Sequence, residues 1–438
     1  MLPELDISLL DETESPSDAL WRTDSEVAEL LALEERRQQT QIELTAPKNY
    51  VSRAVWRALA SAMTLTVTEG YPGNRFHAGT SNVDAVENLA RERAKQLFHC
   101  GHANVQPHSG TQANHAALLG LLERGAKIVS MATDSGGHVS HGAKRNLTGQ
   151  LFATVTYSVD ESTGRLDYSE LARICLRERP RMLIVGGSSY PREIDYRECR
   201  RIADQVGAIL LADIAQVSGL VAAGVHPSPF PYADVVTSTT NKGLRGPQAG
   251  LVLTNDEDLA RAIDHALFPG LQAGALAGAV AAKAVAFREA MQPDFVAYSE
   301  AVLVNARTFC EVMIQRGYDV LTDGTDSPLI MVDLRRTGLR GDVASAALER
   351  VGIICNKNLV PGDRRSPQLT SGLRFGTSGI TTRGLRHDDV LEVAGLVADM
   401  LDEMSDDGAL SRQRESTIKK EVEDLARQFR LDDLFPIG

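Results

Sequence analysis

The sequence predicts an α/β protein whose mostly parallel sheet is covered by helices on both faces. Short apolar runs recur along the middle of the chain, and segments with helical periodicity or loop composition separate them. This alternation is typical of crossover connections between parallel strands, which place ligand sites at the carboxyl ends of the strands. The runs that we predict as strands are 126–132, 181–187, 207–215, 235–240 and 250–255.

Helices are predicted where apolar residues repeat every three or four positions. They include residues 83–98 and a segment that begins at Thr111. The most apolar stretch, 274–287, is too short to cross a bilayer and carries Lys283 near its middle. We therefore expect it to be a closely packed internal helix.

The chain is predicted to divide into three parts. Residues 1–50 form a charged, amphipathic N-terminal arm of a kind that often docks on a partner subunit, and 51–300 form the large domain. After about residue 300 the pattern changes to helices with short strands, which indicates a smaller C-terminal α+β domain over 301–438. The apolar stripe of the arm is Val27, Leu30, Leu31 and Leu33.

Composition excludes several classes of protein. At 438 residues with 43% hydrophobic and 24% charged content, the chain is an ordinary globular protein and not a disordered or membrane-spanning one. A net charge of −12 argues against nucleic acid as a partner, because phosphate binding needs clustered cations. The acidic start lacks the basic and apolar regions of a signal peptide, so we expect a cytoplasmic protein.

Metal and hydrolase chemistry are also disfavoured. The five cysteines are scattered without a close pair, so neither a zinc ribbon nor a disulfide scaffold is predicted. His99 and His102 have a hint of metal spacing, but further close ligands are missing, and we expect no metal. The sequence contains no GxSxG nucleophile elbow.

Two polar residues follow predicted strands at one edge of the sheet. Lys242 comes directly after the strand 235–240, where apolar walls disfavour its ammonium and free the amine for a Schiff base with a carbonyl. A surface lysine on a loop is the alternative. Asp213 closes another apolar run and could keep a pyridine nitrogen protonated, although aspartate is common at strand ends.

Three further features suit an anionic ligand with a ring. Ser109, Gly110 and Thr111 precede an apolar helix, where they either bind an anion or cap the helix. His138 follows two glycines and either stacks on an aromatic ring or belongs to an ordinary loop. Arg374 lies among apolar residues and either binds a carboxylate bidentately or forms a structural salt bridge.

Long blocks of the chain, in one order, resemble serine hydroxymethyltransferase, a pyridoxal-phosphate enzyme of fold type I. The resemblance spans roughly residues 40 to 430 and implies a large domain with a seven-stranded, mostly parallel sheet plus a smaller C-terminal domain. The blocks include EGYPGNRF (69–76), NVQPHSGTQAN (104–114), GGHVSHG (136–142), LLADIAQVSGLVAAGVHP (210–227), TSTTNKGLRGPQAG (237–250), FPGLQAG (268–274) and TSGLRFGTSGITTRG (370–384).

The resemblance implies a role for each matching residue. Lys242 would form the internal aldimine with pyridoxal 5'-phosphate, Asp213 would pair with the pyridine nitrogen, and His138 would stack on the ring. Arg374 would bind the carboxylate of an amino acid, and Glu69 would be the acid/base group. The other implied cofactor residues are Ser109, Gly110, Thr111 and Ser188, with Gln272 and Gly274 from a neighbouring subunit. In this family the active site of each subunit is completed by residues of its partner in a homodimer, and two dimers can pair into a tetramer.

Several positions depart from the family pattern near the reacting groups. Gln216 and Asn241 stand where the family has histidines, Pro47 replaces a serine, and Val67 replaces a tyrosine. Phe76 and His77 stand where the family has two tyrosines, and His77 offers a substitute proton carrier. Thr133 stands where the family has an apolar residue on the folate side. Because lost charged hydrogen bonds weaken transition-state binding, the use of tetrahydrofolate comes into doubt.

We therefore expect an enzyme that acts at Cα of an α-amino acid held as an external aldimine. The leading hypothesis is an aldolase or transaldolase that makes or breaks the Cα–Cβ bond of a β-hydroxy-α-amino acid in specialised metabolism. Folate-dependent interconversion of serine and glycine is the second hypothesis. Oxidative decarboxylation of an amino acid with dioxygen is the third.

Overall fold

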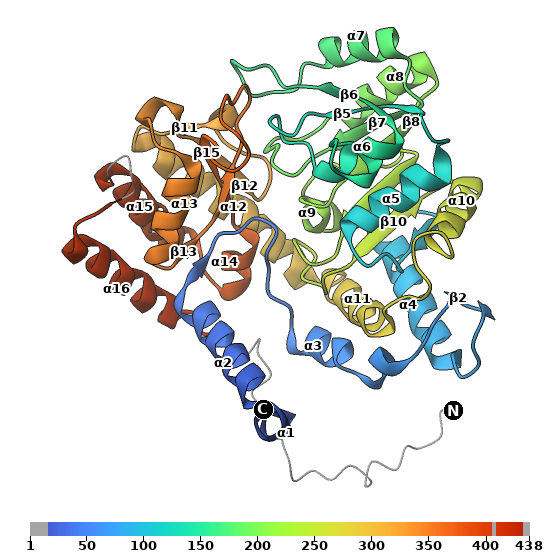
Figure 1. Ribbon diagram of the computed structural model, residues 1–438, viewed down its shortest axis with the longest axis horizontal. Helices are drawn as coiled ribbons and strands as arrows, with labels where there is room; N and C mark the ends of the chain where they lie inside the picture. Colours follow the sequence, from blue (N-terminus) through green and yellow to red (C-terminus); the bar gives the residue numbers. More distant parts are fainter. Residues whose placement is uncertain (1–15, 405–408, 432–438) are drawn as a thin grey trace.

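A seven-stranded sheet forms the centre of the computed structural model, which describes residues 16–404 and 409–431 (Figure 1). The strands lie in the order β4–β10–β9–β8–β7–β5–β6. From β9 to β6 they run parallel, while β10 is antiparallel to both β9 and β4, so the predicted fold class is confirmed. The bounds are β4 (His102–Asn104), β5 (Lys127–Met131), β6 (Ala153–Tyr157), β7 (Met182–Gly186), β8 (Ile209–Asp213), β9 (Val235–Thr239) and β10 (Gly250–Thr254).

Each of the five predicted strands is present with its ends within two residues of expectation. The apolar runs in the sequence did not predict β4 and β6, which are the two edge strands. β4 has only three residues and includes a histidine and an asparagine. In β6 only Tyr157 is buried, so the strand carries little apolar signal. Edge strands expose one side to solvent and are therefore weakly marked in a sequence.

Both faces of the sheet are covered, as the apolar strands require. In β7, Leu183 and Val185 pack into one core cluster, while Met182 and Ile184 pack into another on the opposite face. The first face is covered by α4 (Ser81–Phe98), α7 (Tyr168–Glu178), α8 (Tyr196–Val206) and α11 (Ala277–Ala290). The second face is covered by α5 (Gly110–Leu121) and α10 (Glu257–Leu267). α11 is the predicted internal helix, and Lys283 is buried within it.

A second core lies toward the C-terminus, coloured orange and red in Figure 1. Its antiparallel sheet has the order β11–β12–β15–β14. The elements are β11 (Asp319–Val320), β12 (Leu329–Asp333), β14 (Asn356–Asn358), β15 (Gly372–Gly376), α13 (Gly341–Arg350), α15 (His387–Glu403) and α16 (Arg412–Gln428). The long helix α12 (Pro293–Gln315) contributes Val302 to the first core and Phe309 to the second.

The predicted arm contains two helices, α1 (Pro16–Thr23) and α2 (Ser25–Thr40), at the edge of the molecule (Figure 1). After them β1 (Ile42–Glu43) pairs with β13 (Ile353–Ile354), and Leu44 joins the C-terminal core. The apolar stripe is exposed, with Leu30 at 66%. The first fifteen residues of the arm lie outside the described part, and the domain boundaries stay predictions. In the described ranges, no helix combines the length and apolarity needed to span a bilayer.

Candidate active site

A cavity of about 230 Å³ opens at the carboxyl edge of the parallel strands, beside the first turn of α5. Strand ends supply much of its wall, since Asp213 ends β8 and Thr239 ends β9. The predicted residues that line it are Pro47, Ser109, Gly110, Thr111, His138, Ser188, Asp213, Asn241 and Lys242. The fold therefore brings together groups that lie nearly 200 residues apart in the sequence.

Lys242 lies on the loop after β9, partly buried in the cavity wall. Burial lowers the pKa of its amine to about 8, although the charge of Asp213 opposes the shift. Asn49 holds the loop from the other side, because its amide donates to the Lys242 carbonyl oxygen at 2.8 Å. A larger share of the amine is neutral than at a surface lysine, which is what attack on a carbonyl needs.

Asp213 is a buried carboxylate at the end of the neighbouring strand. Its Oδ2 lies 2.9 Å from both His141 Nε2 and Asn114 Nδ2, and its Oδ1 accepts from the Ala215 amide at 3.0 Å. Burial acts to raise the pKa of Asp213, but the bonds from His141 and Asn114 hold it well below its usual range. The carboxylate is thus ionised and held in one orientation.

His141 and Asn114 were not predicted as site residues from the sequence. Both lie inside blocks that carry the family resemblance, and Asn114 interrupts the apolar face of α5. Its amide also donates to Ser140 Oγ at 2.9 Å and its oxygen accepts from Thr237 Oγ1 at 2.6 Å. A polar residue on the buried face of a helix was the available signal.

The segment Ser109–Gly110–Thr111 begins α5 at the cavity. Ser109 Oγ accepts from the Gln112 amide at 3.1 Å, so the capping alternative is correct for this hydroxyl. Gly110 is required by space, since a Cβ atom there would lie 2.5 Å from Thr239 Cγ2. The first amides of the helix still face the cavity, where they and the helix dipole favour a phosphate.

His138 has a fixed orientation in the cavity wall. Its Nδ1 lies 2.7 Å from Ser140 Oγ and also accepts from the Ser140 amide. Burial lowers the pKa of His138 to about 4, against the opposing charge of Asp213. The imidazole is therefore neutral near pH 7, and its planar ring could stack on an aromatic ring.

Arg374, on β15 of the C-terminal core, contacts Ser188 in the wall of the same cavity. Its Nη1 donates to the Ser188 carbonyl oxygen at 2.8 Å and to Ser188 Oγ at 2.9 Å, and its Nη2 donates to Asn356 Oδ1 at 3.1 Å. Among the residues that the structure describes, no carboxylate forms a salt bridge with Arg374. The structural salt bridge is therefore not the arrangement observed, and a buried guanidinium is left for an anionic ligand.

These residues fit pyridoxal phosphate. The cavity offers an amine, an ionised carboxylate, a neutral imidazole and a helix N-terminus, which match the aldehyde, pyridine nitrogen, ring face and phosphate of that cofactor. Within the described ranges, the buried hydroxyl of Thr239 in this wall has no hydrogen-bond partner. A buried polar group of this kind is usually satisfied by a ligand or water.

A second group of predicted residues lies outside the cavity wall: Val67, Glu69, His77, Gln272 and Gly274. Glu69 forms an isolated β-bridge with Gly274, and Gln272 Nε2 donates to Gln106 Oε1 at 3.2 Å. His77 Nε2 lies 3.4 Å from Glu69 Oε2. The single chain therefore assembles two separate sets of site residues.

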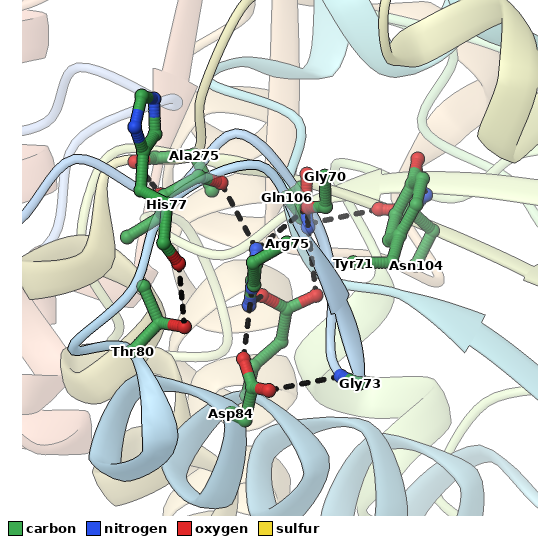
Figure 2. Close-up of polar contacts among 12 residues, drawn as sticks. Gly70, Tyr71, Gly73, Arg75, His77, Thr80, Asp84, Asn104, Gln106 and Ala275 are labelled. Carbon is green, nitrogen blue, oxygen red and sulfur yellow. Dashed lines mark hydrogen bonds and ion pairs between the residues drawn. The ribbon is translucent and has the colours of Figure 1, made fainter.

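A buried polar network fixes the hairpin that carries Glu69, formed by β2 (Gly70–Tyr71) and β3 (Asn74–Arg75) (Figure 2). The Arg75 guanidinium contacts Asp84 at 2.8 Å and Glu87 at 2.6 Å, and it donates to the Gly70 carbonyl oxygen at 2.6 Å. The Arg75 and Glu87 side chains are 3% and 1% exposed. Sequence reasoning missed Arg75 because an arginine beside a turn is usually on the surface.

Two of the positions that depart from the family pattern contact one another. Asn241 Nδ2 donates to the Pro47 carbonyl oxygen at 3.1 Å. Gln216 is buried beside His226 in a small cavity behind Asp213. Thr133 and His138 line a further cavity of about 660 Å³ that adjoins the first. The bond from Asn241 to Pro47 therefore ties the loop after β9 to the segment that follows β1, both in the wall of the first cavity.

A lysine and an aspartate on adjacent strand ends, with an arginine from a second core, define a pyridoxal-phosphate-dependent transferase of fold type I. The family model described as "Serine hydroxymethyltransferase" matches residues 20–397. The chain is 48% identical over 420 residues to a protein of Rickettsia bellii (strain RML369-C) named "Probable serine hydroxymethyltransferase", covering 96% of this chain and 98% of that one. A Rickettsia canadensis (strain McKiel) "Serine hydroxymethyltransferase" is 48% identical over 417 residues, covering 95% and 98%. The chain belongs to the serine hydroxymethyltransferase family.

Proposed function

We propose that the chain interconverts serine and glycine, with tetrahydrofolate as the one-carbon carrier. One observation carries the proposal: 48% identity extends over almost the whole of both chains in relatives named for hydroxymethyl transfer. The expectation of a specialised aldolase has no such support and gives way to the folate-dependent alternative.

The departures at Pro47 and Asn241 also fit this proposal. They weighed against folate chemistry because each removes a polar group of the family pattern. Asn241 donates to the Pro47 carbonyl oxygen at 3.1 Å, so its side-chain amide has a partner in the cavity wall. The cavity of about 660 Å³ beside His138 has room for a second substrate, and Thr133 and Leu359 are in its wall.

The cofactor residues would hold and orient pyridoxal phosphate. Bound pyridoxal phosphate would supply an electron sink for Cα of the amino acid. Lys242 offers the amine to which the cofactor would attach, and the ionised Asp213 would favour a proton on the pyridine nitrogen. Ser109, Gly110 and Thr111 would hold the phosphate at the start of α5, and the neutral His138 would stack on the ring.

The substrate residues orient the bond that breaks. The Arg374 guanidinium, already held by Ser188 and Asn356, binds the carboxylate of serine. Glu69 exchanges a proton with the serine hydroxyl as the hydroxymethyl group leaves or returns, and His77 Nε2 lies 3.4 Å from its carboxylate.

Glu69 acts in the site of a partner subunit within a homodimer. Three apolar side chains beside it are highly exposed in the single chain: Leu65 at 87%, Val67 at 59% and Phe76 at 72%. A cavity of about 580 Å³ next to Asn241 has a wall that includes Tyr50, Trp56 and Pro247 and offers apolar surface to a second copy. Cytoplasmic location, and pairing of dimers into tetramers, stay predictions.

The proposal is tested with purified holoprotein and serine, with and without tetrahydrofolate and with and without oxygen. We expect glycine and methylene-tetrahydrofolate only when folate is present. Folate-independent cleavage of bulky β-hydroxy amino acids at a higher kcat/KM would instead support the aldolase. Oxygen consumption with release of carbon dioxide would support oxidative decarboxylation.

A further inference from the structure

Lys283 is a buried lysine whose hydrogen bonds, within the described residues, all go to backbone carbonyl oxygens. Its side chain is 1% exposed within α11. Its Nζ donates to the carbonyl oxygens of Val105 at 2.5 Å, Pro107 at 3.2 Å and Gly250 at 2.7 Å. An ammonium has three hydrogens, so the three bonds satisfy it completely.

Among residues 16–404 and 409–431, no carboxylate forms an ion pair with Lys283. Burial lowers the pKa of its amine to about 7 against the opposing charge of Glu87, which is itself bonded to Arg75 Nη2 at 2.6 Å and to Gln106 Nε2 at 2.8 Å. Burying a lysine costs free energy, and burying an unpaired carbonyl oxygen costs free energy as well. In return, the Lys283 Nζ group bonds three backbone acceptors at once.

These acceptors lie in the segment that leads into the predicted phosphate site. Val105 and Pro107 come four and two residues before Ser109, and the Gly250 amide donates back to the Pro107 carbonyl oxygen at 2.8 Å. Gly250 also begins β10, directly after Ala249 in the cavity wall. Lys283 thus ties the approach to α5 to the neighbouring strand.

The same segment contacts the Glu69 hairpin on its other side. The side-chain Nε2 of Gln106 donates to the Gly70 carbonyl oxygen at 3.0 Å, a contact drawn in Figure 2. Its Oε1 accepts from Gln272 Nε2. His108 Nε2 lies 3.1 Å from the Gly274 carbonyl oxygen. The strip 105–108 therefore connects the two sets of site residues.

We propose that Lys283 is a positioning residue, which holds the strip 105–108 so that the first turn of α5 is preformed for the cofactor phosphate. The inference rests on the proposed role of Ser109, Gly110 and Thr111, and it adds a residue that touches neither cofactor nor substrate. Without the Lys283 Nζ group, the three carbonyl oxygens lose their shared donor and the strip loses its anchor.

The test compares pyridoxal phosphate with pyridoxal, which lacks the phosphate. In Lys283→Met, whose side chain has a similar length but no charge, we expect the Kd for pyridoxal phosphate to rise about tenfold or more. The Kd for pyridoxal should change by less than about threefold, because the ring and aldehyde contacts are intact. Arg288→Met, which removes an exposed cation from the same helix, is the matched control and should alter neither value.

A second measurement does not depend on the cofactor. Millimolar inorganic phosphate should raise the Tm of the wild-type apoprotein and that of Arg288→Met, but not that of Lys283→Met. If Lys283→Met does not fold, Lys283→Ala is purified with n-propylammonium, which replaces the missing atoms. Withdrawal of the amine should then weaken binding of pyridoxal phosphate before the helical signal falls.

The outcomes separate this inference from the proposed function. Equal losses of affinity for both ligands would reduce Lys283 to a general structural role, and unchanged affinities would overturn the inference outright. Loss of fold and of phosphate affinity together in the amine-withdrawal experiment would also overturn it. A wild-type protein that binds the cofactor but does not cleave serine would contradict the proposed function and leave the role of Lys283 standing.

Discussion

The Nε2 atom of His77 lies 3.4 Å from Oε2 of Glu69, across the hairpin that β2 and β3 form. The Phe76 amide donates to the Glu69 carbonyl oxygen at 3.1 Å and fixes this approach. An imidazole thus stands beside the carboxylate predicted to transfer a proton, at a position where the family resemblance leads one to expect tyrosine. The two side chains are close enough to pass a proton between them.

Replacing His77 tests whether the pair acts as a unit. His77→Ala should lower kcat for serine cleavage by about a hundredfold and flatten the pH–rate profile, because Glu69 loses its proton partner. His77→Tyr, which restores the family residue, should recover most of the rate. His265→Ala, at an exposed histidine on α10, is the control. Unchanged kcat and profile in His77→Ala would remove His77 from the reaction.

The ion pair of Arg75 and Glu87 should dominate the stability of the hairpin. Arg75→Leu leaves a buried carboxylate unpaired and should lower the free energy of unfolding by about 3–5 kcal/mol in urea titration. The double variant Arg75→Leu/Glu87→Leu should be less destabilised than either single variant. Breaking the exposed pair of Arg173 and Glu170 should leave the free energy of unfolding nearly unchanged. Additive losses at Arg75 and Glu87 would show that the two are not coupled.

Arg374 should determine affinity for the substrate carboxylate. Arg374→Lys replaces a planar fork with a point charge and should raise KM for serine by about tenfold or more. The absorbance of the bound cofactor should persist, because the contacts of Lys242 and Asp213 do not involve this guanidinium. Arg335→Lys, at an arginine paired with Asp333, is the control. Loss of cofactor in Arg374→Lys, with KM unchanged, would reassign Arg374 to cofactor binding.

The lowered pKa of Lys242 predicts a pH dependence for cofactor capture. Its amine has a pKa of about 8 rather than 10.5, so the reactive neutral form accumulates as pH rises through 8. In stopped-flow mixing of apoprotein with pyridoxal phosphate, the rate should rise with a midpoint near pH 8 and then level off. A midpoint above pH 10 would mean that burial does not perturb the amine.

Much of the fold could be predicted from local patterns of apolar residues. The runs that became β7, β8 and β9 are uninterrupted apolar stretches, because strands covered on both faces need no polar side. β4 and β6 lacked that pattern at the edges of the sheet. The candidate cavity residues were predicted from motifs, since Lys242, Asp213 and Ser109 each follow or precede a regular element at the same sheet edge.

The sequence by itself determined the family, the sheet and the identity of the groups in the cavity, because strand periodicity and motif order are encoded locally. Only the tertiary structure decided which groups meet. It gave Asp213 its partners His141 and Asn114, separated Glu69 from the cavity of its own chain, and placed Lys283 against three carbonyl oxygens. Hydrogen bonds between distant segments depend on packing geometry, which no spacing along the chain records.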